Sequence, residues 1–247
     1  MRGYGQFCPV AKAAEIFAER WTPLLLRELL CGSVHFSDLH RGIPLMSRSL
    51  LSLRLKQLEE TGVVKRKQGR QGPEYQLTQA GREFAPIIQN LGEWGHRWFR
   101  TKFGRDELDV SLLMWDMRRC VKPSAFPAGQ FSVQFAFPDQ PASKRNWWLV
   151  SDGLEVDLCL TDHGFEVGLY VATDLRTMTR IWMGDLPVKA AVDSGAIEIE
   201  GSRDLRQRFE RWLGLSAFAE VKDARRLTGA STDRTRSEQE ANLRRPV

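Results

Sequence analysis

The sequence FSDLHRGIPLMSRSLLSLRLKQLEETGVVKRKQGRQGPEYQLT, residues 36–78, decides the fold of the first half of the chain. It predicts a short helix over residues 36–41 and, after a break at residues 42–46, a longer helix that begins after Ser47 and ends at Gly62. Ser47 is a good N-cap because its hydroxyl can accept from an unpaired backbone amide of the first turn, and glycine commonly ends a helix. Residues 63–77 hold two short strands around a glycine-containing loop, which predicts a β-hairpin.

The longer helix has one apolar face. Leu51, Leu55 and Leu58 recur at helical spacing and predict a buried stripe, whereas the opposite face carries polar and basic side chains. A helix, a turn, a second helix and a basic hairpin form the layout of a winged helix-turn-helix, in which one helix enters the major groove of DNA. We therefore expect a double-stranded DNA operator as the partner of this half of the chain.

Two groups of residues are candidates for DNA contact, one on the longer helix and one on the hairpin. Arginine can bond two acceptors on a guanine edge, and serine can reach bases or phosphates. Basic side chains of a wing contact phosphate or the minor groove, which positions the protein more than it specifies sequence. Arg54 lies near the leucine stripe, so an internal ion pair with Glu28 or Asp38 is an alternative for it. The candidates are Ser47, Arg48, Ser49, Ser52, Arg54 and Lys56 on the helix, and Lys65, Arg66, Lys67 and Arg70 on the hairpin.

The charge of the chain is unevenly distributed. Residues 1–102 hold 16 Lys and Arg against 9 Asp and Glu, a balance of +7, while residues 103–247 hold 20 against 22, a balance of −2; together they give the net charge of +5. A basic half suits a polyanion, because each cation that neutralises a phosphate releases counterions. The second half has no such bias, so we expect a different role for it.

Several classes of protein are excluded by composition. No run of about 18 apolar residues indicates a membrane span, and the N-terminus lacks the pattern of a secretory signal. Cys8, Cys31, Cys120 and Cys159 are scattered, which argues against a zinc site and a disulfide framework and favours a reducing cytoplasm. The histidines have no ligand spacing, and no catalytic triad, phosphate loop or paired carboxylates occur, so we expect no metal, no cofactor and no enzymatic activity.

Three further helices are expected in the first hundred residues. They cover residues 7–18, with Val10, Ala14 and Phe17 as the buried stripe, residues 22–31, and residues 79–103. The third has an apolar face too large for one small domain to cover, and a surplus apolar face is often an interface. We interpret it, alone or together with the first helix, as the dimerisation element of a homodimer, which would place two recognition helices on one face of DNA. The alternative is that the C-terminal domain packs on this face.

The second half predicts an α+β domain. A helix over residues 108–121 is followed by strands at residues 131–137, 147–150, 156–160 and 167–171, a helix after Asp174, a strand at 196–200 and a last helix over 203–213. We place a first domain at residues 1–104, a second at 105–224, and a disordered polar tail at 225–247. Aromatic side chains of the second domain suit either a core or the wall of an apolar ligand site; the candidates are Trp115, Phe131, Phe135, Trp148, Tyr170 and Trp182.

The first half resembles the HxlR-type family of bacterial winged-helix transcription regulators. The resemblance is carried by segments that include Cys8-Pro9-Val10, Arg20-Trp21-Thr22, Leu26-Arg27-Glu28-Leu29, Phe36-Ser37-Asp38-Leu39 and Arg54-Leu55-Lys56-Gln57-Leu58-Glu59. It implies a dimeric DNA-binding regulator. Some relatives sense oxidants or aldehydes through a cysteine at the place of Cys8, where a helix N-terminus favours a thiolate. The alternative for Cys8 is packing, which is also our interpretation of the other three cysteines.

The second half resembles the sterol carrier protein-like domains. The resemblance rests on Val167-Gly168-Leu169-Tyr170-Val171, Ile181-Trp182-Met183-Gly184-Asp185 and Phe209 with Arg211-Trp212-Leu213. It implies a fold of sheet and helices around an apolar tunnel that holds lipid-like ligands in relatives. The combined prediction is a dimeric regulator with a hydrophobic small-molecule effector. The alternatives are a thiol-based redox regulator that uses Cys8, and a lipid carrier whose winged helix mediates protein contacts.

Overall fold

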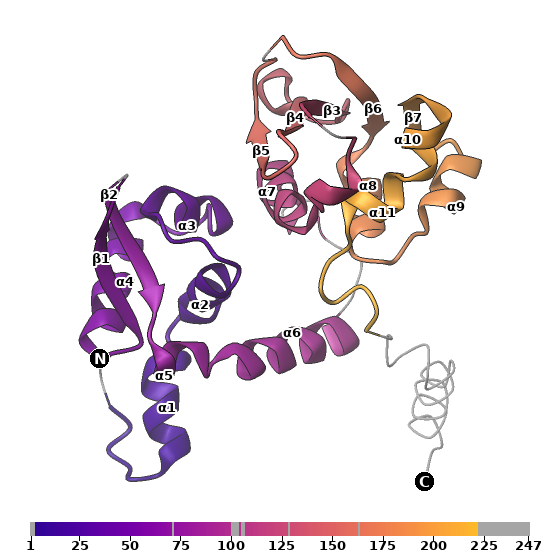
Figure 1. Cartoon of the computed structure of the whole chain (residues 1–247). Helices are drawn as coiled ribbons and strands as arrows, with labels where there is room; N and C mark the ends of the chain where they lie inside the picture. The colour runs from indigo at the N-terminus through magenta and orange to yellow at the C-terminus, as the bar shows by residue number, and fades with distance from the viewer. Residues whose placement is uncertain are drawn as a thin grey trace, which may run out of the picture.

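The computed structural model describes residues 3–70, 72–99, 104, 107–127, 129–162 and 164–221. Within these residues the chain folds around two separate hydrophobic cores, one built from residues between 25 and 77 and one from residues between 110 and 213. Figure 1 shows the two parts, with α6 running between them. The predicted boundary at residue 104 stays a prediction, and the predicted disordered tail at 225–247 lies outside the described residues.

The N-terminal part consists of helices followed by a hairpin and two more helices. Its core is formed by the leucines of the second, third and fourth helices, and it includes Leu51, Leu55 and Leu58 of the predicted stripe. The prediction of helix, turn, helix and hairpin is therefore confirmed. The elements are α1 (Pro9–Phe17), α2 (Thr22–Leu30), α3 (Phe36–Gly42), α4 (Arg48–Glu60), β1 (Val64–Gly69), β2 (Gly72–Leu77), α5 (Gln79–Arg82) and α6 (Ala85–Phe99).

Local chemistry explains where α4 and the hairpin begin and end. The Ser47 hydroxyl accepts from the backbone amide of Leu50 at 3.3 Å and caps α4. Gly62 follows the helix with φ of +73°, a conformation that glycine adopts without steric cost. The strands β1 and β2 pair antiparallel with Val64 opposite Leu77. At the same end of the hairpin the Thr78 hydroxyl donates to the Gly62 carbonyl at 2.6 Å, which joins the residues before β1 and after β2.

Two expectations for the N-terminal part were wrong. The helix predicted over residues 79–103 is divided into α5 and α6, because Pro86 lacks an amide hydrogen and its ring excludes the carbonyl four residues before it; residues 100–103 lie outside the described part. In α1 no residue is buried, and Val10 is 75% exposed. Nothing within the described chain covers that side of α1, although Phe17 stacks on Phe84 with ring centroids 5.6 Å apart.

The C-terminal part is a five-stranded sheet with helices against one face. The strand order is β5-β4-β3-β6-β7, with β3 and β6 parallel in the centre and every other pair antiparallel. This confirms the predicted α+β arrangement, although the final predicted helix divides in two at Arg208. The elements are α7 (Val110–Cys120), the 3-10 turns η2 (Pro123–Ala125) and η3 (Ala142–Lys144), β3 (Phe131–Ala136), β4 (Asn146–Ser151), β5 (Val156–Cys159), β6 (Val167–Thr173), α8 (Leu175–Trp182), α9 (Val188–Asp193), β7 (Ile197–Gly201), α10 (Arg203–Gln207) and α11 (Phe209–Leu213).

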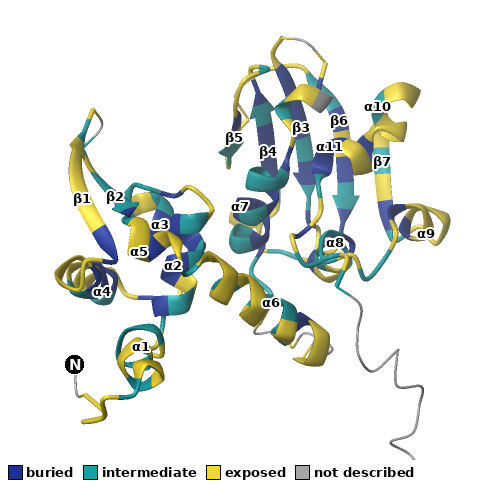
Figure 2. Ribbon diagram, turned by 60° about the horizontal axis from the view of Figure 1, so that its bottom comes forward, coloured by how far each residue is buried: buried dark blue, intermediate teal, exposed yellow. Residues whose placement is uncertain are grey.

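Residues alternate between the two faces of this sheet. Phe131, Val133 and Phe135 of β3 point to the face covered by α7, α8 and α11, where they join Met114, Met178 and Trp212 in the core. The dark blue strands of Figure 2 mark this buried layer, whereas α6 is largely exposed. Among the described residues, no helix is long and apolar enough to cross a membrane.

Candidate nucleic-acid interface

The solvent-facing side of α4 carries the predicted contact residues. Arg48, Ser49, Ser52 and Lys56 are all exposed, on the side away from the buried leucines. The Arg48 guanidinium lies 5.5 Å from the centroid of the Phe36 ring, an arrangement that orients the side chain through a cation–π contact. Ser47 is exposed as well, and its hydroxyl lies 3.2 Å from that of Ser49. This part of α4 is therefore open to a groove of DNA.

Arg54 differs from these neighbours because it is only 8% exposed. Its Nη2 lies 3.0 Å from Oε2 of Glu19, and its Nη1 donates to Oε1 of Gln57 at 2.8 Å. The sequence left DNA contact and an internal ion pair open for Arg54, and in the structure Arg54 forms an internal ion pair. The partner is Glu19, which the sequence pattern did not indicate, rather than Glu28 or Asp38. Arg54 therefore holds α4 against the segment after α1.

The hairpin is fixed to the helical body through the middle of β2. The Tyr75 amide donates to the Val34 carbonyl at 2.8 Å, and Glu74 forms an antiparallel bridge with His35. These bonds connect β2 to the segment just before α3. The hairpin is thus a wing that projects from the helical body, as Figure 1 shows.

The wing is rich in positive charge, and its carboxylate of Glu74 lies opposite Lys67 in the hairpin register. Lys65, Arg66, Lys67 and Arg70 are exposed, and none of them forms an ion pair with a described residue. On α4, Lys56 lies 3.8 Å from Glu60, a pair in which both side chains are more than half exposed. Such a surface attracts the phosphates of a nucleic acid, because their neutralisation releases counterions.

These features define a helix-turn-helix protein of the winged type, and comparison with known proteins gives its family. A family model described as HxlR-like helix-turn-helix matches residues 16–103. The HTH-type transcriptional regulator YvaP of Bacillus subtilis is 39% identical over 102 residues, which is 40% of this chain and 94% of that protein. YdeP of the same organism is 33% identical over 94 residues, 37% of this chain and 73% of that protein. The chain belongs to the HxlR-like helix-turn-helix family of transcriptional regulators.

A solved structure of another transcriptional regulator is similar to a portion of this chain. The reduced form of the transcriptional regulator YodB from B. subtilis is 27% identical, with a TM-score of 0.33, over 37% of this chain and 94% of that one. The sequence relatives establish the family.

The two parts of the chain meet at a buried carboxylate. Glu28 in α2 is 0% exposed and accepts from Arg119 of α7 at 2.9 Å and 3.2 Å, from Arg27 at 2.6 Å, and from the indole of Trp115 at 3.4 Å. Arg119 also pairs with Asp116. The pKa of Arg119 is raised, because the nearby carboxylates of Asp116 and Glu28 outweigh burial, which lowers it.

The aromatic candidates for ligand binding lie at separate places. Trp115 is at the junction with Glu28, surrounded by the guanidinium groups of Arg41, Arg118 and Arg119 at 5.5, 4.8 and 5.8 Å from its ring centroid. Phe131 and Phe135 belong to the core between sheet and helices, and Trp182 is half-buried at its margin.

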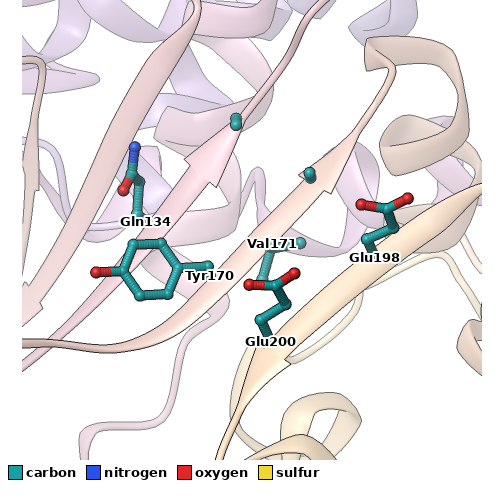
Figure 3. A pocket seen from close by; sticks show the side chains of 7 residues that line it. Gln134, Tyr170, Val171, Glu198 and Glu200 are labelled. Carbon is teal, nitrogen blue, oxygen red and sulfur yellow. The ribbon is translucent and has the colours of Figure 1, made fainter.

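Trp148 and Tyr170 lie on the opposite face of the sheet from Phe131 and Phe135. Their position follows from the strand register, since Trp148 and Tyr170 each pair with Gln134 of β3 and paired residues point to the same face of a sheet. Tyr170 is 47% exposed and borders a hollow of about 220 Å³ on that face, shown in Figure 3. The hollow is lined by Gln134, Ala136, Tyr170, Val171, Ala172, Glu198 and Glu200. A ligand role for the six aromatic candidates stays a prediction.

The cysteines are spread over the structure. Cys8 is half-buried at the N-cap of α1, and its side chain makes no capping hydrogen bond. A redox role for Cys8 stays a prediction. Cys31 is exposed, so its interpretation as a packing residue was wrong. Burial raises the pKa of the Cys120 and Cys159 thiols. No group of three or more metal-ligating side chains occurs in the part of the chain that the structure describes.

Sequence reasoning missed the junction between the two parts. Nothing in the pattern of charges paired Glu28 with Arg119, since 91 positions separate them. The signal that could have indicated such a site is a carboxylate inside the apolar run of α2, between Leu26 and Leu29. A buried charge must be paired, so a cation from elsewhere in the chain was needed.

Proposed function

We propose that this regulator binds an operator by placing α4 in the major groove and the wing along the phosphate backbone. The observation that carries the proposal is the exposed surface formed by Arg48, Ser49, Ser52 and Lys56 on α4 and by the unpaired cations of the wing. Contacts from α4 would read base edges, and contacts from the wing would position the protein.

We also propose that the regulator acts as a homodimer joined through α1 and α6. The apolar side chains of α6 are about half exposed, at 46% for Ile87, 45% for Leu91, 54% for Trp94, 45% for Trp98 and 63% for Phe99. The alternative is that the C-terminal part covers α6, and it contacts this helix where the Phe218 ring lies against Gly92. A contiguous exposed apolar face of this kind supports an interface with a second copy.

The C-terminal part is proposed to tune DNA binding in response to a hydrophobic effector. Its contact with α2 and α3 at Glu28 and Trp115 gives a physical connection to the DNA-binding part. An effector shifts DNA affinity only if it binds the two states of the protein differently. A change in the contact at Glu28 and Trp115 would distinguish two states of the protein with different affinities for the effector.

Reversal of the wing charge tests the proposal. The full chain and the triple variant Lys65→Glu, Arg66→Glu, Lys67→Glu are titrated into a fluorescent DNA duplex at several salt concentrations. We expect weaker binding by the variant and a salt slope that is smaller by about 0.9 for each phosphate that the variant no longer neutralises. The matched control reverses the exposed cations Lys122, Lys189 and Arg203 of the C-terminal part. Equal salt slopes for the two triple variants would refute the assignment of the wing.

The redox hypothesis is separated from the effector hypothesis by one substitution. Cys8→Ser removes the thiol and keeps a polar group of similar size at the N-cap of α1. If Cys8 were the sensor, the response of DNA binding to an oxidant would disappear in this variant. If an effector regulates the protein instead, the oxidant has the same effect on DNA binding by the wild type and by Cys8→Ser.

A lipid carrier is the third hypothesis, and the wing variant addresses it. For a carrier whose winged helix contacts only proteins, DNA binding by the wild type would be absent at any salt concentration. Lipid transfer would then be unchanged by reversal of the wing charge.

A further inference from the structure

A cavity of about 400 Å³ lies where the turn before α4 meets the start of α7. One wall comes from the DNA-binding part, with Trp21 and Leu24 near the start of α2 and residues 42–45 between α3 and α4. The other wall comes from the C-terminal part. The residues that line it are Trp21, Leu24, Arg27, Gly42, Ile43, Pro44, Leu45, Glu107, Leu108, Asp109 and Leu112. Its volume falls in the range of about 300–1,000 Å³ that is usual for small-molecule sites.

The walls of this cavity are mainly apolar, and two of their leucines are left in solvent. Leu24 is 40% exposed and Leu45 is 81% exposed, although both belong to segments that pack against the core. Leu108 and Leu112 face them from the C-terminal part and are half-buried. Apolar side chains that converge on a hollow from two parts of a molecule are typical of a ligand site.

Arg27 supplies the polar end of the cavity. Its Nε donates to Glu28 at 3.1 Å, and its Nη2 donates to Glu28 at 2.6 Å and to the Gly42 carbonyl at 3.1 Å. These bonds fix the guanidinium and leave Nη1 without a partner among the described residues. A bound molecule with an oxygen acceptor can use that donor.

The charges at the cavity favour a neutral ligand. Arg27 is already neutralised by Glu28. Glu107 and Asp109 add carboxylates to the lining, and Asp109 is held in place as the N-cap of α7 by the amides of Ser111 and Leu112 at 2.7 and 3.2 Å. An anionic ligand would meet these carboxylates, whereas a neutral molecule would meet apolar walls and one donor.

We propose that this cavity binds a neutral apolar molecule, about the size of a two-ring aromatic, with one oxygen acceptor directed to Arg27. The inference deepens the proposed effector response and rests on it for its regulatory meaning. The ligand would touch the turn at residues 42–45, which leads through Ser47 into α4, and would touch α7 at the same time. Its binding therefore biases the position of α4 relative to the C-terminal part.

Prodan, a neutral naphthalene ketone whose emission moves to the blue in apolar sites, is the probe. The full chain is titrated by fluorescence and compared with the double variant Leu24→Gln, Leu45→Gln. The matched control is Leu154→Gln, Leu215→Gln, because these leucines are 84% and 44% exposed and lie away from the cavity. We expect saturable binding by the wild type and the control, and a dissociation constant at least about tenfold higher for the cavity variant.

The outcomes are distinct. Absence of saturable Prodan binding by the wild type overturns the inference, and so does equal binding by the two double variants. If the double variant at the cavity does not fold, Leu45→Gln alone replaces it, because that side chain is already in solvent. DNA binding is followed separately by the anisotropy of a labelled duplex. Failure of the wild type to bind a duplex overturns the proposed function, while a Prodan site that follows the expected pattern stands by itself.

Discussion

Arg119 of α7 holds Glu28 of α2 through two parallel bonds, Nη1 to Oε2 at 2.9 Å and Nη2 to Oε1 at 3.2 Å. This fork joins the C-terminal part to the helix-turn-helix part at a carboxylate that solvent does not reach. Bidentate pairs between arginine and carboxylate are among the stronger hydrogen-bonded contacts and have a fixed geometry. The pair therefore sets how α7 lies on α2.

Replacement of Glu28 tests the strength of this connection. In Glu28→Gln the guanidinium groups of Arg27 and Arg119 lose their shared anion, and Arg119 keeps only Asp116. Removal of one partner from a buried pair costs about 3–5 kcal/mol. We expect the free energy of unfolding, measured in urea by tryptophan fluorescence, to fall by about 3–5 kcal/mol.

Glu60→Gln is the matched control for this experiment. Glu60 pairs with Lys56 at 3.8 Å in solvent, with side chains 62% and 73% exposed. Exposed pairs of this kind contribute about 0–1 kcal/mol. A similar loss of stability in the two variants would contradict the role of Glu28 at the junction.

Asp116 gives the junction a dependence on pH. Burial raises the pKa of this carboxyl and outweighs Arg27 and Arg119, which lower it. The folded protein therefore binds this proton more tightly than the unfolded chain, whose value is about 3.9. The stability contributed by the group is present below that value and is lost as the pH rises through the folded pKa. We expect the free energy of unfolding of wild type, relative to Asp116→Asn, to decrease as the pH rises above about 4.

Asp152 provides a control of opposite sign. Backbone amides, first that of Glu155, lower the pKa of Asp152. Stability contributed by a lowered carboxyl pKa is present above the unfolded value and is lost as the pH falls. Wild type compared with Asp152→Asn should therefore lose stability as the pH falls below about 4, and it should show no loss as the pH rises above that value. Parallel trends for the two variants would show that the assignment for Asp116 is wrong.

The recognition surface of α4 can be divided into specific and general contacts. With an operator obtained by selection from random duplexes, we expect Arg48→Ala to weaken binding by about 1–3 kcal/mol and to relax the preference at one base pair. Lys56→Ala should weaken binding to all duplexes alike, because a phosphate contact carries no sequence information. The readout is the ratio of affinities for the operator and for single-base variants. An unchanged ratio in Arg48→Ala would remove Arg48 from base recognition.

The dimer hypothesis predicts that charge on α6 separates the two copies. Leu91→Glu with Trp94→Glu places two carboxylates on the exposed apolar face, and we expect sedimentation velocity to show a monomer where wild type is a dimer. Leu154→Glu with Leu160→Glu is the matched control, since those leucines are 84% and 55% exposed elsewhere. A monomeric wild type, or a dimer in the α6 variant, would contradict the proposed interface.

The local order of the fold was predictable because short-range signals decide it. Ser47 and Gly62 mark the limits of α4, and each has the predicted role. The strand predicted at residues 131–137 corresponds in the same way to β3, which covers Phe131–Ala136. Such signals depend on a few neighbouring residues, so a single sequence is sufficient to read them.

Contacts between distant residues were not predictable in this way. Arg54 was left between DNA contact and an ion pair with Glu28 or Asp38, and its actual partner is Glu19, because the three carboxylates are equivalent until the helices are placed. The cavity at Leu24 and Leu45 depends on how α7 lies against the turn before α4. Helical spacing gives the face on which a side chain lies, and the element that meets this face is given only by the tertiary structure.

The parallel pairing of β3 with β6 has a consequence for the order of folding during synthesis. Ser132 pairs with Val167, so the centre of the sheet closes only after β4 and β5 have been made, whereas the helix-turn-helix core closes within residues 25–77. Long-range pairings form slowly, and domains fold from the N-terminus as the chain emerges. A nascent chain therefore completes its DNA-binding half first, with Glu28 paired to Arg27 alone until α7 settles on the finished sheet and brings Arg119 to it.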